Sequence, residues 1–170
     1  GDAFFPDEVK VFMDTGFFRM EGKLNSGDAH IVVDYQGLLN QGLIGYEKRC
    51  KDLKDNLDLT KAESLNKYQF YKAVLIVIEA VKNFAKRYAN LARDLAKDAK
   101  YKRKSELVEI AKICDHVPYE KSSSFKEAIQ AVWFIQLILQ IESNGHSLSF
   151  GRFDQYINPF LEKDLKEGKI

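Results

Sequence analysis

The segment Ala131-Val-Trp-Phe-Ile-Gln-Leu-Ile-Leu-Gln140 is one of the most apolar runs in the chain, and it leads directly into the polar segment Ile141-Glu-Ser-Asn-Gly-His-Ser147. Upstream, Ser124-Phe-Lys-Glu127 matches a capping box and predicts where this helix begins. Because the helix is apolar nearly all round, it is predicted to be central and surrounded by other elements. Asn144-Gly145 suits its end.

The polar residues that follow this helix need hydrogen-bond partners, because a polar group left unpaired in a protein interior costs about 1–3 kcal/mol. Local backbone, neighbouring helices or a bound small molecule could supply them. His146 and Ser147 place an imidazole beside a hydroxyl at this break, near Glu142 and Asn144. Such groups in an apolar surround can hold a small polar molecule. The alternative is a helix C-cap that binds the helix's own last carbonyl groups.

Residues 61–100 have the clearest helical periodicity. Their apolar residues recur at spacings of three and four and form a broad stripe: Tyr68, Tyr71, Val74, Leu75, Ile78, Val81, Phe84, Ala85, Tyr88, Leu91, Ala92 and Leu95. Further helices are predicted near 36–50, where three glycines weaken the helix without forbidding it, near 105–115, and from Gln155 or Pro159 to Glu167.

The N-terminal part has a different texture. Residues 1–34 are rich in Gly and Phe, which predicts short elements and loops. The predicted fold is therefore mainly α, with a loop-rich segment at 1–35 that carries His30 and a helical segment at 36–170.

Composition and charge disfavour several classes of protein. The chain has 170 residues, 45% of them hydrophobic, which suits one compact domain or a piece of something larger. Lys and Arg total 26 against 25 for Asp and Glu, so the net charge of +1 draws in neither nucleic acid nor an anionic membrane. Two cysteines do not make a disulfide framework, no signal peptide is visible, and the longest apolar runs fall short of the ~20 residues that span a bilayer. A cytoplasmic location is expected.

The other two histidines are also candidate site residues. His30 lies between a glycine-containing loop and the apolar triplet Ile31-Val-Val33, where its imidazole could face a cavity with Asp28 or Asp34 beside it. The alternative is a hydrogen-bonded structural histidine. His116 follows Cys114 at a predicted helix end, but no second ligand pair has zinc spacing, so helix capping is preferred and no metal site is predicted.

Nine basic and two acidic residues between Lys82 and Lys104 give a local charge of +7. Such a face can bind nucleic acid, with Tyr88 and Tyr101 available for stacking. Solvated helix faces commonly have this composition, however, and the window contains no nucleic-acid motif, so no such partner is expected. The chain also lacks a phosphate loop, a His-Glu-x-x-His motif and a nucleophile elbow.

The segment Glu142-Ser-Asn-Gly-His-Ser-Leu-Ser-Phe-Gly-Arg-Phe-Asp-Gln-Tyr156, continued by Pro159-Phe-Leu-Glu-Lys-Asp164, closely resembles a segment of the glycyl radical enzymes, the pyruvate formate-lyase-like family. Upstream pieces agree in order: His30-Ile-Val-Val-Asp-Tyr35, Glu109-Ile-Ala-Lys-Ile-Cys114, Phe125-Lys-Glu-Ala-Ile-Gln130 and Trp133-Phe134. Gly151-Arg-Phe-Asp-Gln-Tyr156 is similar to the branch with glycerol and propanediol dehydratases and choline trimethylamine-lyase. The resemblance covers most of the chain.

The resemblance implies a helical segment of the family's α/β barrel, within a lyase or dehydratase for a small hydroxylated substrate such as glycerol, propanediol or choline. It implies that His30, His146 and Ser147 bind the substrate hydroxyls and that His30 is a candidate general acid for the departing hydroxide. It also implies a glycyl radical in the parent enzyme, installed by an S-adenosylmethionine iron–sulfur activase. Ala29 and Val33 depart from the glycine and proline of the family's histidine loop.

The family's Gly-Cys-x-Glu cysteine and its radical glycine do not occur in these 170 residues, and neither Cys50 nor Cys114 has the expected neighbours. The chain is therefore expected to be an inactive fragment without a bound cofactor, with the rest of the barrel, the activase and the substrate as partners. An exposed apolar surface and self-association are expected. Two alternatives stay open: a fragment of a pyruvate formate-lyase-type formate acetyltransferase, and a stand-alone helical interaction module without catalysis.

Overall fold

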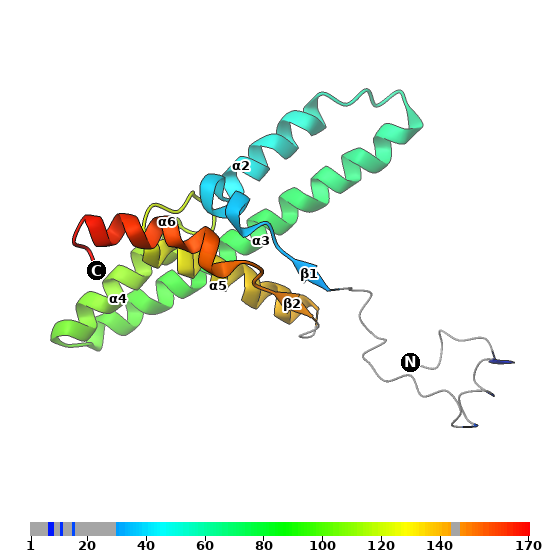
Figure 1. Cartoon of the computed structure of the whole chain (residues 1–170). Helices are drawn as coiled ribbons and strands as arrows, with labels where there is room; N and C mark the ends of the chain where they lie inside the picture. Colours follow the sequence, from blue (N-terminus) through cyan, green and yellow to red (C-terminus); the bar gives the residue numbers. More distant parts are fainter. Residues whose placement is uncertain (1–6, 9–10, 12–14, 16–29, 144–146) are drawn as a thin grey trace.

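The computed structural model describes residues 7–8, 11, 15, 30–143 and 147–170. In this part of the chain, helices dominate and two very short strands pair with each other (Figure 1). The mainly α fold predicted from periodicity is confirmed. The elements in chain order are β1 (Ile31–Val32), α2 (Tyr35–Asp55), α3 (Ala62–Asp98), α4 (Tyr101–His116), α5 (Phe125–Glu142), β2 (Leu148–Ser149) and α6 (Phe153–Lys166).

Helices α2 and α3 lie side by side, and their joined ends project from the other helices as an arm (Figure 1). α2 is broken at Gly42, whose φ of 67° and ψ of 174° are not helical. The break leaves backbone groups free for the loop after α4: Leu43 N donates to Pro118 O at 3.0 Å, and Ile44 N to Tyr119 O at 2.9 Å. Ser122 N donates back to Leu39 O at 3.0 Å. The loop after α4 therefore supplies hydrogen-bond partners for backbone groups that the break in α2 leaves unpaired within the helix.

Helix α3 packs on α4 through small side chains. Ala85, Ala89, Ala92 and Ala96 are buried, and they face Leu107, Ala111 and Cys114 of α4. The predicted stripe was wrong in part, since Tyr88, Leu91 and Leu95 are 42%, 52% and 52% exposed. The alanines allow the two helices to approach closely, and this rotates the larger residues out of the contact.

Helix α5 lies against α2, α4, α6 and β2. Its predicted capping box is confirmed in modified form: Ser124 Oγ accepts from Glu127 N, whereas the Glu127 carboxylate accepts from Ser123 N at 2.7 Å, one residue earlier than in the standard box. Its buried face joins α2 and α6 in the largest core cluster, formed by Tyr35, Leu38, Leu39, Val117, Ala128, Ala131, Val132 and Ile157.

The prediction that other elements surround α5 was wrong for this chain. Trp133 is 54% exposed and Ile141 65% exposed, because no described element covers that side of the helix. The predicted exposed apolar surface is therefore confirmed. Among the described helices, none combines the length and apolar character needed to cross a lipid bilayer.

Candidate functional site

The strand pair brings together the segments that carry His30 and Ser147. β1 and β2 are parallel, with Ile31 opposite Leu148 and Val32 opposite Ser149. Ile31 N donates to Ser147 O at 3.1 Å, so His30 and Ser147 each directly precede the paired residues. His30 is exposed and Ser147 is half-buried. His146 lies outside the described residues.

A buried amide ties this strand pair to the helices. Gln136 of α5 is 5% exposed and accepts a hydrogen bond from the Tyr35 hydroxyl at 2.7 Å. Its Nε2 donates to Leu148 O at 3.1 Å. Tyr35 begins α2 just after β1, so one side chain contacts both segments that carry the candidate site residues.

The backbone around the site takes up unusual conformations. Ser147 has a φ of 45°, a left-handed value that non-glycine residues rarely adopt and that clusters at functional sites. Gly151 also has a positive φ, 63°, and a Cβ there would lie 2.8 Å from Val32 Cγ1. Glycine at 151 therefore lets the chain after β2 pass close to β1.

Aromatic side chains cluster in the segments that follow the two strands. The ring centroids of Tyr35 and Tyr156 are 5.5 Å apart, and Phe150 and Phe153 lie 6.0 Å apart beside them. The Tyr156 hydroxyl donates to Phe150 O at 2.8 Å. Burial raises the pKa of both tyrosines to about 12, helped at Tyr35 by the neighbouring Tyr156. Both hydroxyls therefore stay protonated, as hydrogen-bond donors, at neutral pH.

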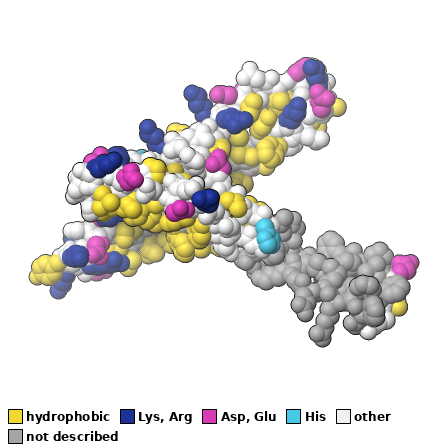
Figure 2. All heavy atoms as spheres, in the orientation of Figure 1, with side chains coloured by type: hydrophobic (Ala, Val, Ile, Leu, Met, Phe, Trp, Pro, Cys, Tyr) yellow, Lys and Arg dark blue, Asp and Glu magenta, His cyan; other side chains and the backbone are white. Residues whose placement is uncertain are grey.

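An apolar groove of about 390 Å³ opens beside β2. It is lined by Ile129, Val132, Trp133, Phe150 and Phe153. In the space-filling view, hydrophobic side chains gather in a strip along the lower edge of the molecule (Figure 2). The groove has no polar group suited to a hydroxylated molecule, so its chemistry fits packing against other polypeptide.

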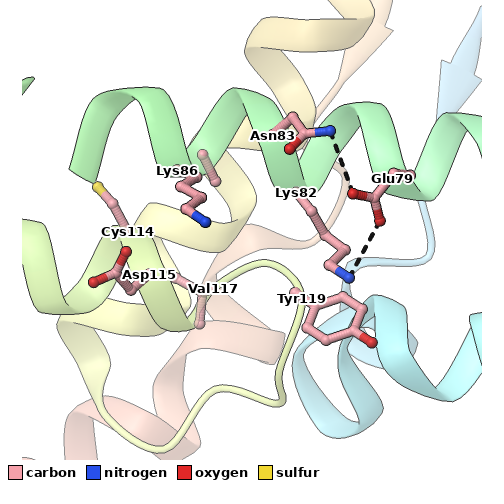
Figure 3. Close-up of a pocket in the computed structure, with 9 residues that line it drawn as sticks. Glu79, Lys82, Asn83, Lys86, Cys114, Asp115, Val117 and Tyr119 are labelled. Carbon is pink, nitrogen blue, oxygen red and sulfur yellow. Dashed lines mark hydrogen bonds and ion pairs between the residues drawn. The ribbon is translucent and has the colours of Figure 1, made fainter. Parts of the chain in front are cut away.

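A second hollow, of about 320 Å³, lies between α3, α4 and the loop after α4, and is lined by both acidic and basic groups (Figure 3). Lys82 Nζ lies 3.3 Å from Glu79 and 4.0 Å from the Tyr119 ring centroid. Burial raises the pKa of the Cys114 thiol, so it stays protonated and unreactive at neutral pH. The hollow thus offers charged groups of both signs and an inert thiol.

The remaining sequence candidates have structural partners. His116 ends α4, as expected of a capping residue, and its Nδ1 lies 3.1 Å from Glu127 Oε1. Four of the nine basic residues at 82–104 form ion pairs with acidic neighbours: Lys82, Arg93, Lys97 and Arg103. In the described part of the chain, no cluster of three or more His, Cys, Asp or Glu could hold a metal ion.

Comparison with known proteins identifies the family of the chain. The model of the family described as pyruvate formate lyase-like matches residues 2–170. The chain belongs to the pyruvate formate lyase-like family.

Curated and solved members of this family cover nearly the whole chain. A probable dehydratase of Escherichia coli, YbiW, is 42% identical over 95% of the chain. A solved structure concerning 1,2-propanediol dehydration in Roseburia inulinivorans has a TM-score of 0.92 and 39% identity over 99% of the chain. The glycerol-bound B12-independent glycerol dehydratase of Clostridium butyricum has a TM-score of 0.86 and 36% identity over 94%. The chain spans 20% of the length of each of these relatives.

Three parts of the candidate site were not predicted from the sequence: the strand pair, the Tyr35–Gln136 contact and the need for Gly151. The triplet Ile31-Val-Val33 carried a weak strand signal. Gln136, a polar residue within an apolar helix, signalled that a buried partner was required. Neither signal says which distant segment supplies the partner.

Proposed function

We propose that this chain is the part of a glycyl radical lyase or dehydratase that contributes binding groups for a small hydroxylated substrate. The observation that carries the proposal is the parallel pairing of β1 with β2. This pairing brings His30 and Ser147 to the same end of the strand pair. Relatives named for 1,2-propanediol dehydration and as a glycerol dehydratase support a diol or polyol as substrate.

The proposed binding groups suit hydroxyl recognition. An imidazole can donate or accept a hydrogen bond, and a serine hydroxyl can do both, so His30, His146 and Ser147 could pair with adjacent hydroxyls of one molecule. A site built to pair hydroxyls rejects analogues that lack one by as much as ~10⁴–10⁵. In this proposal His146 and Ser147 set specificity, and His30 additionally donates a proton to departing hydroxide.

The reactive groups would come from outside these residues. A glycyl radical, installed in the parent by an S-adenosylmethionine iron–sulfur activase, would supply hydrogen abstraction from the substrate. Cys114 is buried against Ala85, Ala89 and Phe134, and burial raises the pKa of its thiol, so it does not suit a radical carrier facing the strand pair. The chain alone is therefore proposed to be inactive.

The proposed main partner is the rest of the parent barrel. The apolar groove beside β2 and the exposed side of α5 are suited to pack against it, and Trp133 is the largest exposed side chain there. The activase and a second copy of the parent are further proposed partners; nucleic acid and membrane are not. A cytoplasmic location is proposed because both cysteines are free thiols.

The test is a substrate screen of the complete gene product after anaerobic activation, with glycerol, 1,2-propanediol, choline and pyruvate. Two substitutions separate the hydroxyl of Ser147 from its backbone conformation. Ser147→Gly removes the hydroxyl and tolerates the positive φ, whereas Ser147→Ala removes the hydroxyl and keeps the strain. Ser105→Ala, on the exposed side of α4, is the matched control.

Both Ser147 variants should lose kcat/KM on a hydroxylated substrate by about 10–100-fold, the loss expected for one to two hydrogen bonds in a closed site. His30→Gln should lower kcat more than it raises KM. Turnover of pyruvate alone would favour the formate acetyltransferase alternative, and no turnover of any substrate would favour the non-catalytic module.

A further inference from the structure

Gln136 occupies a position where an apolar residue would be expected. It lies in the middle of α5 and is 5% exposed, among residues such as Val132 and Ile135. Burying a primary amide is unfavourable unless its donors and acceptor are paired. Two partners are present, the Tyr35 hydroxyl at 2.7 Å and the Leu148 carbonyl at 3.1 Å.

The chemistry of the partners sets the orientation of the amide. The Leu148 carbonyl can only accept, so the NH₂ group of Gln136 must face it. The Gln136 oxygen then faces Tyr35, whose hydroxyl donates. Because burial raises the pKa of Tyr35 to about 12, that hydroxyl keeps its proton over the whole physiological range. The contact is therefore a directional bridge between two segments.

The strand pair needs such support. Each strand is two residues long, and an isolated two-stranded pair of any kind is marginally stable in water. Ile31 is 41% exposed and Val32 63% exposed, so little apolar burial holds β1 in place within this chain. Gln136 contacts the chain just after β1, at Tyr35, and β2 itself, at Leu148.

We infer that Gln136 is a positioning residue whose side-chain amide sets the spacing between the segments that carry His30 and Ser147. The expected effect on catalysis rests on the proposed function, whereas the expected effect on the structure of the two segments does not. Gln136 is not one of the proposed substrate-binding groups, and its hydrogen bonds go to Tyr35 and Leu148. It acts through Leu148, the neighbour of Ser147, and through Tyr35, which follows β1 in the chain.

The test uses the complete polypeptide that the gene encodes. Gln136→Met keeps the length and volume of the side chain and removes both hydrogen bonds. Gln130→Met, the same change on the same helix at a half-buried position, is the control. Tyr35→Phe removes only the hydrogen bond from the Tyr35 hydroxyl to Gln136. Amide hydrogen exchange is measured at 31–35 and 147–150, and kcat and KM are measured on the hydroxylated substrate.

Gln136→Met should raise exchange at both segments by at least ~10-fold, while Gln130→Met should match the wild type. It should lower kcat/KM by about 10–100-fold, the scale of a sub-ångström to ångström misplacement. The double variant with Ser147→Gly should lose less than the product of the two single fold-losses, because part of the Gln136→Met effect acts through Ser147. A general loss of stability would instead add to the Ser147 effect.

Unchanged exchange at the two segments, or kcat/KM losses that add in the double variant, would overturn the inference. If Gln136→Met does not fold, Tyr35→Phe decides: faster exchange at 147–150 supports the bridge, and wild-type exchange there rejects it. A wild-type protein that turns over no hydroxylated substrate, yet shows the exchange response, would reject the proposed function and retain the bridge.

Discussion

Replacing Gly42 by alanine should be among the most damaging single-methyl additions in this chain. Gly42 breaks α2 with a φ of 67° and a ψ of 174°, a region that is essentially restricted to glycine. A Cβ at this position would lie 2.5 Å from the Glu120 carbonyl carbon and 2.7 Å from Lys121 N, and would also contact Tyr119 O. All three neighbours are backbone atoms, so the clash cannot be relieved by turning a side chain.

The cost has two parts. The backbone conformation costs about 1–3 kcal/mol for a residue with a Cβ. Moving the loop away disturbs the bonds from Leu43 N to Pro118 O, from Ile44 N to Tyr119 O and from Ser122 N to Leu39 O. At about 0.5–1.5 kcal/mol each, the three bonds bring the expected total to about 2.5–7.5 kcal/mol. That is a large share of the ~5–15 kcal/mol that holds an ordinary domain together.

Urea unfolding followed by circular dichroism measures this difference in the free energy of unfolding. Gly168→Ala is the matched control, because Gly168 has nearly the same φ, 65°, but a Cβ added there would meet no atom within 4 Å. Gly168→Ala should lower the free energy of unfolding by only ~1–2 kcal/mol, the cost of placing a residue with a Cβ in the left-handed conformation. Repeating each curve at two protein concentrations separates unfolding from self-association.

Equal destabilisation by Gly42→Ala and Gly168→Ala would contradict this prediction. That result would mean that the loop at 118–122 does not press against the break in α2, and that conformational strain alone sets the cost.

Three further outcomes follow from the structure. The chain should self-associate, and Trp133→Gln, at a site 54% exposed, should raise the monomer fraction in light scattering; a wild-type monomer would contradict this. Because burial raises the pKa of Tyr35 and Tyr156 to about 12, the unfolded chain loses these protons first, near pH ~10, so the contribution of the two tyrosines to stability should be constant below that pH and fall from about 10 to 12. Tyr35→Phe should weaken that fall in urea titrations. Asp164→Ala removes the carboxylate that accepts from Phe125 N at 2.8 Å at the start of α5, and should lower the unfolding free energy by about 1–3 kcal/mol; a neutral result would exclude this contact as a cap.

Much of the local structure could be predicted from the sequence. The helix at 62–98, the Ser124 cap and the end of α6 near Glu167 follow from spacing and from residue type, because each depends on neighbours within one or two turns. The candidate site could be predicted only as two separate polar segments, around His30 and around His146 and Ser147. Their proximity depends on pairing between residues far apart in the chain.

The buried faces of α3 and α5 could not be predicted from the local sequence either. In α3 the sequence offers both large apolar residues and alanines at helical spacing, and the periodicity does not say which set α4 will contact. The structure buries Ala89 and leaves Leu91 half exposed, because close approach of two helices favours the smaller side chains. In α5, burial of Gln136 became possible only once Tyr35 and Leu148 were both within reach.

The extents of the helices and the Ser124 cap of α5 were therefore set by residues close together in sequence, whereas the break at Gly42 is also held by the distant loop at 118–122. The parallel pairing of β1 with β2, the bridge at Gln136 and the exposed side of α5 were decided by tertiary contacts alone. The physical reason is that a helix closes its hydrogen bonds within four residues, whereas a strand pair and a buried amide need partners that only the folded chain brings together.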